Sequence, residues 1–220
     1  MIQSRLDALL IGLPQPFHPT RGKSSMARQP ATVPVAVGAL GFAGDAVADP
    51  SVHGGPDKAV HFYPAEHYAA WRSELGDHPR LAAPGGFGEN ISALGLTEDC
   101  VRIGDRFRIG TALVEVAQGR QPCWKLDHHF GRKTMAADVI RTGRCGFYFR
   151  VIEAGVVAPG DAIAQVGSGP PQWTVARVFS LLIGGGHKQI GAHSALAELA
   201  ALPALAINWR ARAAKLLAAN

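Results

Sequence analysis

The strongest constraint on the fold is a change in sequence character at Gly167-Ser168-Gly169-Pro170-Pro171. Glycine and proline at this density disfavour both helix and strand, so the stretch predicts a linker. Up to about residue 166 the chain is rich in Gly, Pro and short runs of β-branched and aromatic residues, which is typical of strands joined by turns. Beyond the linker, apolar residues recur at helical spacing. We therefore expect two domains, residues 1–166 and residues 172–220.

The first of these domains is expected to be mainly β. Many short strands with Gly-rich turns favour a barrel or a sandwich over a βαβ fold. Ile109-Gly110-Thr111 predicts the turn of a hairpin. One helix is expected to have Pro64 in its first turn and to end at Gly76, since proline lacks an N–H and glycine suits a helix C-terminus. The candidate strands cover residues 33–37, 59–63, 101–109, 112–116, 147–152 and 162–166.

The second domain is predicted to be a small unit of three helices. Leu205, Trp209 and Leu216 form an apolar stripe of the kind that a helix buries. Ser194 and Pro203 are residue types that start helices, and each precedes a helical segment. The expected helices cover residues 173–183, 194–202 and 203–219.

Composition and charge exclude several classes of protein. With 47% hydrophobic and 18% charged residues, a chain of 220 residues can bury a core. No run reaches the ~18 apolar residues of a membrane span, and the N-terminus has no signal-peptide pattern. The three cysteines include no CxxC pair, which argues against a disulfide framework or a zinc ribbon and favours a reducing, cytoplasmic setting. The net charge of +5 favours anionic partners, but Lys and Arg are scattered, so nucleic acid is not expected as the main partner.

Cys123 is the most informative candidate for chemistry. It lies in Arg120-Gln121-Pro122-Cys123-Trp124-Lys125, after a predicted strand. Pro122 restricts the backbone just before the thiol, and Arg120 and Lys125 favour a thiolate if they lie near the sulfur. A thiolate is a good ligand for a soft or high-valent metal centre. A buried, inert cysteine is the alternative interpretation, and it is the one that we adopt for the other two cysteines.

Three further segments carry groups that suit an anion. In His53-Gly54-Gly55-Pro56-Asp57-Lys58 the paired glycines let backbone N–H groups approach an anion, and two side chains add donors. Gly88-Glu89-Asn90 combines a glycine with an amide. Ser24 and Arg28 offer a hydroxyl and a guanidinium suited to phosphate. An ordinary Gly-Pro turn and a solvated loop are the alternative interpretations.

Other familiar catalytic motifs are missing from the sequence. It contains no GxSxG, no P-loop and no HExxH. His128 and His129 are adjacent, so their side chains point in different directions on a strand or a helix, and we do not expect them to join Cys123 in a zinc site.

Taken together and in order, these segments resemble the MOSC family, named for the C-terminal domain of molybdenum cofactor sulfurase, and above all its YiiM-like branch. The likeness covers roughly residues 20–166. The helical tail is similar to the three-helix C-terminal domain of that branch. The matching pieces are Gly41 to Asp45 with Ala48-Asp49, His53 to Val60, Tyr63 with Glu66 to Tyr68, Gly86 to Asn90, Ile103 to Asp105, Arg120 to Lys125 and Gly146 to Val151.

The resemblance implies a MOSC-type β-barrel with short helices that binds a molybdenum cofactor of the molybdopterin form. The metal-binding cysteine of the family maps onto Cys123, which is therefore the expected molybdenum ligand and catalytic residue. Ser24 and Arg28 match a Thr and a Lys of the family's N-terminal motif. Gly119 stands where the family usually has Pro, which predicts a looser loop beside the metal. The cofactor-binding residues expected on this basis are Ser24, Arg28, His53, Gly54, Gly55, Lys58, Gly88, Asn90, Arg120 and Gln121.

Members of this family reduce N-hydroxylated compounds, including hydroxylamino bases and amidoximes. The resemblance thus implies a reductase that removes oxygen from a small N–OH substrate. Since no flavin, haem or iron–sulfur motif is visible, an external electron-donor protein is expected. The alternative is a persulfide carrier in which Cys123 delivers sulfur to metal clusters, and a third hypothesis is a non-catalytic cofactor or nucleotide carrier. Molybdenum content separates the first hypothesis from the second, and turnover of a hydroxylamino substrate separates it from the third.

Overall fold

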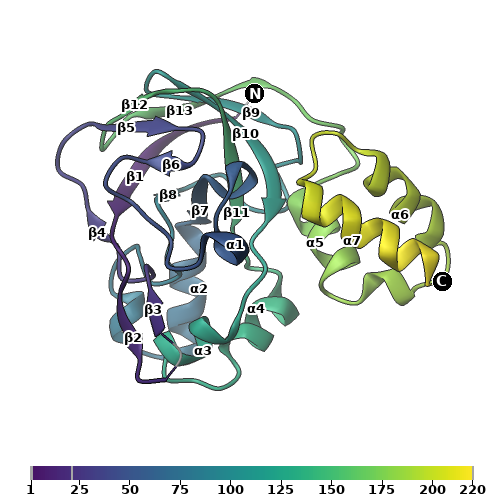
Figure 1. Cartoon of the computed structure of the whole chain (residues 1–220), viewed down its shortest axis with the longest axis horizontal. Helices are drawn as coiled ribbons and strands as arrows, with labels where there is room; N and C mark the ends of the chain where they lie inside the picture. Colours follow the sequence, from purple (N-terminus) through teal and green to yellow (C-terminus); the bar gives the residue numbers. More distant parts are fainter. Residues whose placement is uncertain (1, 21, 220) are drawn as a thin grey trace.

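A computed structural model describes residues 2–20 and 22–219 (Figure 1). In the order of their pairing, the main strands are β13 (Ala162–Gly167), β9 (Arg106–Ile109), β10 (Ala112–Gly119), β11 (Phe147–Glu153), β7 (Val60–Pro64), β8 (Ile91–Ala93) and β1 (Gln3–Ile11). Because β1 also pairs with β13, these seven strands of the described chain close into a barrel, as the sequence predicts. The pair β7–β8 is parallel, and the other pairs in the ring are antiparallel.

Shorter strands flank the barrel. A three-stranded sheet is formed by β5 (Val35–Gly38), β6 (Gly41–Phe42) and β12 (Gly155–Val157). A hairpin is formed by β2 (Gln15–His18) and β3 (Gly22–Ser24), and β4 (Gln29–Pro30) pairs with the end of β1. The sequence pattern predicted that β5 begins two residues too early and did not predict the other five of these strands, because strands of two to four residues carry too little periodicity to detect.

The helices fall into two groups (Figure 1). Those of the barrel unit are α1 (Pro50–His53), α2 (Glu66–Leu75), α3 (Trp124–His129) and α4 (Met135–Thr142), with single 3₁₀ turns η1 (Pro56–Lys58) and η2 (Pro79–Leu81). Those of the tail are α5 (Val175–Leu182), α6 (Ala192–Ala201) and α7 (Ile207–Ala218), with η3 (Gly186–Lys188). Within the described residues no helix has the length and apolar character needed to cross a membrane.

Aromatic side chains fill the barrel. Phe62 and Phe147 stack with ring centroids 4.7 Å apart. Phe149 contacts Phe147 edge-on, and Phe107 contacts Phe149 edge-on. All four rings are fully buried. Each such burial contributes about 1.5–3 kcal/mol. Because side chains alternate along a strand, the inward position of Phe147 and Phe149 turns Tyr148 between them to the other face of β11, where the candidate site lies.

Two predicted boundaries need correction, and one strand was not predicted. The hairpin at Gly110 is confirmed, with Ile109 opposite Ala112, but β9 begins at Arg106 rather than at residue 101. The preceding residues form a turn because the Asp105 carboxylate accepts the Arg102 N–H at 2.9 Å. Pro64 ends β7 instead of starting a helix, and α2 begins at Glu66. The strand β1 was not predicted, because a bulge after its buried Leu6 interrupts the alternation.

The three tail helices are present, with different starting points for two of them. The helix α6 begins at Ala192 after Gly191, whose φ of 86° suits glycine, so Ser194 lies inside the helix. The helix α7 begins at Ile207 rather than at Pro203. The residues before it dock the tail on the barrel instead, since the Ala206 N–H donates to the carbonyl oxygen of Ala117 in β10 at 2.9 Å.

The connection between the two units is held in place. The Gly169 N–H donates to the Asp105 carboxylate at 2.8 Å, and a side chain at Gly169 would lie 2.0 Å from the carbonyl oxygen of Ile103. The linker is therefore an ordered segment that lies against the barrel, and the separate folding of residues 1–166 and 172–220 stays a prediction.

The expectation of a looser loop at Gly119 is wrong. Gly119 is the buried last residue of β10, opposite Phe147 of β11. The tail covers it, because a Cβ at this position would meet Trp209, Phe179 and Val175 at 3.2–3.4 Å. Glycine here permits close packing of the helical tail on the barrel.

Candidate functional site

A cavity of about 460 Å³ opens beside β7 and β11. The segments that line it are the loop after β3, the loop from residue 45 through η1, the loop before β8 and the start of α3. Nine of the ten expected cofactor-binding residues and Cys123 lie in this lining. The members of that set are Ser24, Arg28, His53, Gly54, Gly55, Lys58, Gly88, Asn90, Arg120 and Cys123.

Cys123 is held at the edge of the cavity by local structure. Its backbone is extended, and it stands at the N-terminal boundary of α3, where its carbonyl oxygen accepts the Leu126 N–H at 2.9 Å. Its side chain is half-buried. By contrast, Cys100 is exposed on a turn, and burial raises the pKa of the fully enclosed Cys145 thiol well above its ordinary value. Of these three described cysteines, Cys123 is the one in the cavity lining.

Arg28 does not offer an uncompensated charge to the cavity. Its Nε and Nη2 donate to the two carboxylate oxygens of Asp45 at 2.7 and 2.8 Å, and both side chains are buried. Its Nη1 donates to the carbonyl oxygen of Gly88. Arg28 and Asp45 thus form a neutral, bidentate pair in the wall. The sequence analysis missed Asp45, although this residue lies in one of the pieces that carry the resemblance.

Asn90 is also fully engaged by the protein. Its Nδ2 donates to Asp45 at 3.0 Å and to the carbonyl oxygen of Leu10 at 3.2 Å. Its Oδ1 accepts the His61 N–H at 3.0 Å. The side chain joins β1, β7 and the wall, so its role in the site is to fix the positions of other groups.

The remaining cations give the cavity a positive character. His53, Lys58, Arg120 and Lys125 line the same cavity, and the pKa of His53 is lowered by burial and then by the charges of these three cations. Burial also lowers the pKa of Lys58, whose Nζ donates to the carbonyl oxygen of Val52. Among the described lining residues, Asp45 is the one carboxylate, and Arg28 already neutralises it. The cavity therefore suits an anionic ligand.

His61 is a site residue that the sequence analysis did not single out, since it covered this position only by the candidate strand at residues 59–63. Its Nδ1 lies 3.1 Å from the carbonyl oxygen of Gly88, so Nδ1 carries the proton and Nε2 is a bare acceptor. Burial, then the charge of Arg120, holds the pKa of His61 well below its ordinary value. Neither Nε2 of His61 nor Oγ of Ser25 has a hydrogen-bond partner among the described residues. Both side chains line the cavity and are available to a ligand.

Gln121 departs from the expected set. It is exposed and lies outside the 460 Å³ cavity, in the lining of a second hollow between the barrel and the tail. The backbone turns between Arg120 and Cys123, at the buried Pro122, and this turn separates the two neighbours.

Comparison with known proteins finds relatives that match most of the chain. The MOSC domain family matches residues 49–164. The chain is 43% identical to the uncharacterized protein YflK of Bacillus subtilis over 173 residues, 77% of each chain. It is 37% identical over 156 residues to a protein of Gibberella moniliformis named reductase, covering 70% of this chain and 28% of the fungal one. The crystal structure of YiiM from Geobacillus stearothermophilus superposes with a TM-score of 0.81 at 33% identity, covering 97% of this chain and 99% of that one.

Proposed function

Since this chain belongs to the MOSC domain family, we propose that it is a molybdenum-cofactor-dependent reductase of N-hydroxylated compounds. MOSC domains are associated with molybdenum cofactor binding in general. The observation that carries the proposal is that Cys123 lines a large, electropositive cavity together with the donors expected to hold an anionic cofactor. A fungal relative that bears the name reductase supports the reaction class.

The chemistry of the lining fits the molybdopterin form of the cofactor. The cavity volume lies within the usual range for small-molecule and cofactor sites. Its cations, Lys58, Lys125 and Arg120, suit the cofactor's phosphate. The bare Nε2 of His61 suits an N–H donor of the pterin, and the sulfur of Cys123 is the protein ligand to molybdenum in this proposal.

The reaction is the reduction of R–NHOH by two electrons and two protons to R–NH₂ and water. When bound, the molybdenum cofactor supplies the two-electron chemistry that breaks the N–O bond. An external electron-donor protein restores the two electrons after each turnover. The chain's own residues bind and orient the reactants.

Two features of the cavity lining would help the reaction: one supplies a proton, and the other keeps water out. Burial lowers the pKa of Lys58, which makes its Nζ a better proton donor than an exposed lysine. Met26, Ala59 and Phe87 are buried apolar members of the lining and exclude water from that side of the cavity. We assign to Lys58 the delivery of a proton to the departing oxygen.

Turnover tests this proposal. Freshly purified protein is assayed for molybdenum and pterin and is then given a chemically reduced dye with a hydroxylamino purine or with benzamidoxime. The proposal expects stoichiometric molybdenum and formation of the aminopurine from the first compound and of benzamidine from the second. Protein that contains transferable sulfur at Cys123 and no molybdenum would instead support the persulfide carrier.

A further inference from the structure

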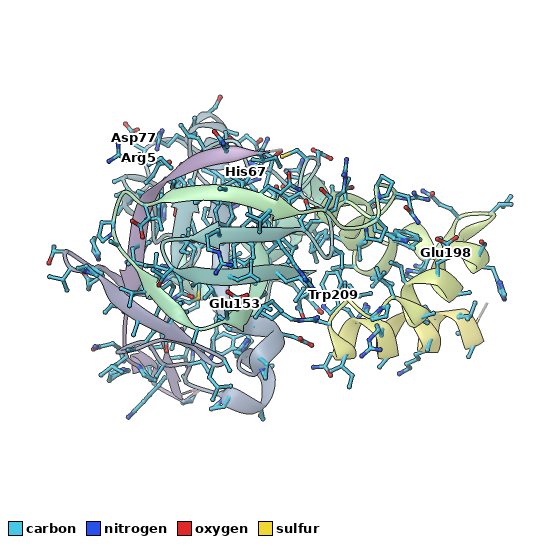
Figure 2. The ribbon with its side chains drawn as sticks, turned by 90° about the horizontal axis from the view of Figure 1, so that it is seen from above. Arg5, His67, Asp77, Glu153, Glu198 and Trp209 are labelled. Atoms are coloured by element: carbon cyan, nitrogen blue, oxygen red, sulfur yellow. The ribbon has the colours of Figure 1, made fainter. Side chains whose placement is uncertain are left out.

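A second cavity, of about 340 Å³, lies between the barrel and the helical tail. Its walls come from α1, from the end of β10 with the segment after it, and from α7. Figure 2 shows Trp209 of α7 at the junction, while Glu198 lies farther out on the tail. We name this space the junction chamber, and it is lined by Ser51, Val52, His53, Lys58, Gln118, Gln121, Tyr148, Asn208, Trp209 and Arg212.

The junction chamber adjoins the candidate cofactor cavity. His53, Lys58 and Tyr148 line both spaces. The two spaces therefore share part of their lining, and a molecule in the chamber would lie beside a ligand in the first cavity.

The tail wall of the chamber is fixed by specific contacts. The Ile207 N–H, at the start of α7, donates to Oδ2 of Asp57 at 3.0 Å. The other oxygen of Asp57 accepts from Arg150 of β11 at 2.8 Å. Because Asp57 precedes Lys58, the same carboxylate ties α7 to the loop that separates the two spaces. Asn208 follows Ile207 and is thereby held in the chamber wall.

The chemistry of the lining points to a planar ligand with hydrogen-bonding edges. Gln118 is only 2% exposed, its Nε2 donates to the carbonyl oxygen of Gly119, and its Oε1 has no partner within the part of the chain that is described. A buried carbonyl oxygen of this kind requires a donor. Asn208 adds a second carboxamide, and Trp209 and Tyr148 add flat aromatic surface.

We propose that the junction chamber is the substrate subsite, in which Gln118 and, from the helical tail, Asn208 bind the hydrogen-bonding edge of an N-hydroxylated heteroaromatic base. The inference rests on the proposed function and deepens it. It gives the tail a direct role in substrate selection. It also makes benzamidoxime, whose phenyl ring has no hydrogen-bonding edge, a substrate that depends little on these two amides.

Asn208→Ala tests the subsite, with Lys215→Ala as the matched control. Lys215 is exposed on the same helix and lies outside the chamber lining. For a hydroxylamino purine, Asn208→Ala is expected to raise KM by ~3–10-fold, the effect of losing one hydrogen bond, with kcat and molybdenum content unchanged. The KM for benzamidoxime should stay the same in both variants. Gln118→Met, which removes the carbonyl oxygen at similar volume, should show the same selectivity.

Two results would overturn the inference. Equal changes of KM for the purine and for benzamidoxime would show that the chamber does not read the ring edge. Loss of molybdenum in Asn208→Ala would assign the chamber to the cofactor.

A binding measurement separates failure of this inference from failure of the proposed function. If the wild-type protein reduces neither compound, calorimetry with adenine, the amine product type, still applies. Adenine binding that weakens in Asn208→Ala and persists in Lys215→Ala supports the subsite, and no adenine binding to the wild type rejects it.

Discussion

Arg28 and Asp45 are joined by two hydrogen bonds, of 2.7 and 2.8 Å, in the wall of the cofactor cavity. Both side chains are buried, and Asp45 also accepts from Gly12 N and Asn90 Nδ2. A guanidinium that was expected from sequence to bind the ligand is therefore committed to holding the wall together.

This pairing predicts a large cost for removing one partner. Asp45→Asn leaves the Arg28 charge buried without a counter-charge, and breaking such a pair typically costs ~3–5 kcal/mol of the free energy of unfolding. The control is Glu153→Gln, which breaks the exposed Arg108–Glu153 pair of the same 2.7 Å length (Figure 2 labels Glu153) and should cost under ~1 kcal/mol. Chemical denaturation of both variants measures the difference, and similar costs for the two would contradict the structural role of Asp45.

Burial of His129 predicts a loss of stability in mild acid. Burial lowers its pKa from 6.5 to about 4. The unfolded chain therefore binds a proton as the pH falls below 6.5 while the folded chain does not, so the free energy of unfolding decreases down to about pH 4. Between pH 6.5 and 5 this amounts to about 2 kcal/mol, at ~1.4 kcal/mol for each pH unit.

The variant His129→Gln isolates that contribution. Other buried groups also titrate, and burial raises the pKa of Glu89, which opposes the trend above its unfolded value of 4.5. These groups are common to both proteins, so the difference between the two slopes belongs to His129. Parallel pH profiles of unfolding for the wild type and the variant would refute the prediction.

The close contact of Gly119 with the tail predicts that any side chain there is costly. A Cβ at Gly119 would lie 3.2 Å from the Trp209 ring and 3.3 Å from Phe179, so Gly119→Val should cost ~1–3 kcal/mol by overpacking. It should also loosen the tail and speed its cleavage by trypsin. Gly38→Val is the control, because a Cβ there meets nothing within 4 Å. Equal trypsin rates for the two variants would show that Gly119 does not hold the tail.

Cutting the chain after Pro171 tests the division into domains. The shortened protein keeps β13 and the Gly169 contact with Asp105. It exposes the β10 surface that Trp209 and Phe179 cover, so lower solubility is expected. If the barrel folds independently, the shortened protein should still retain molybdenum. A folded truncation that loses the metal would mean that the tail completes the cofactor site.

Local signals explain which parts of the fold could be predicted. Gly110 and its apolar neighbours suffice to identify the β9–β10 hairpin, and Gly76 suffices to end α2. The strand β1 could not be found, since its bulge lies between Leu6 and Ala8 and its partners in the barrel ring, β8 and β13, are 82 to 161 residues away. Pairing at such separations leaves no periodic trace in the sequence.

The candidate site likewise has parts that could be predicted from the sequence and parts that could not. Cys123 and the loop from His53 to Lys58 are compact motifs, and the structure brings them to one cavity. His61 could not be recognised, because its bare Nε2 depends on a contact with Gly88, 27 residues away. The pairing of Arg28 with Asp45 and the involvement of α7 are likewise tertiary properties that residue type does not encode.

The most direct test of the account is the molybdenum content per chain of Cys123→Ser, measured beside Cys100→Ser and Cys145→Ser. Only the first of these cysteines lines the cavity among the described residues, while the second is exposed on a turn and the third is enclosed in the core. We expect that Cys123→Ser, folded and purified like the wild type, contains no stoichiometric molybdenum, and that both other variants retain it. Equal molybdenum in Cys123→Ser and in the wild type would contradict the central claim that the sulfur of Cys123 holds the metal.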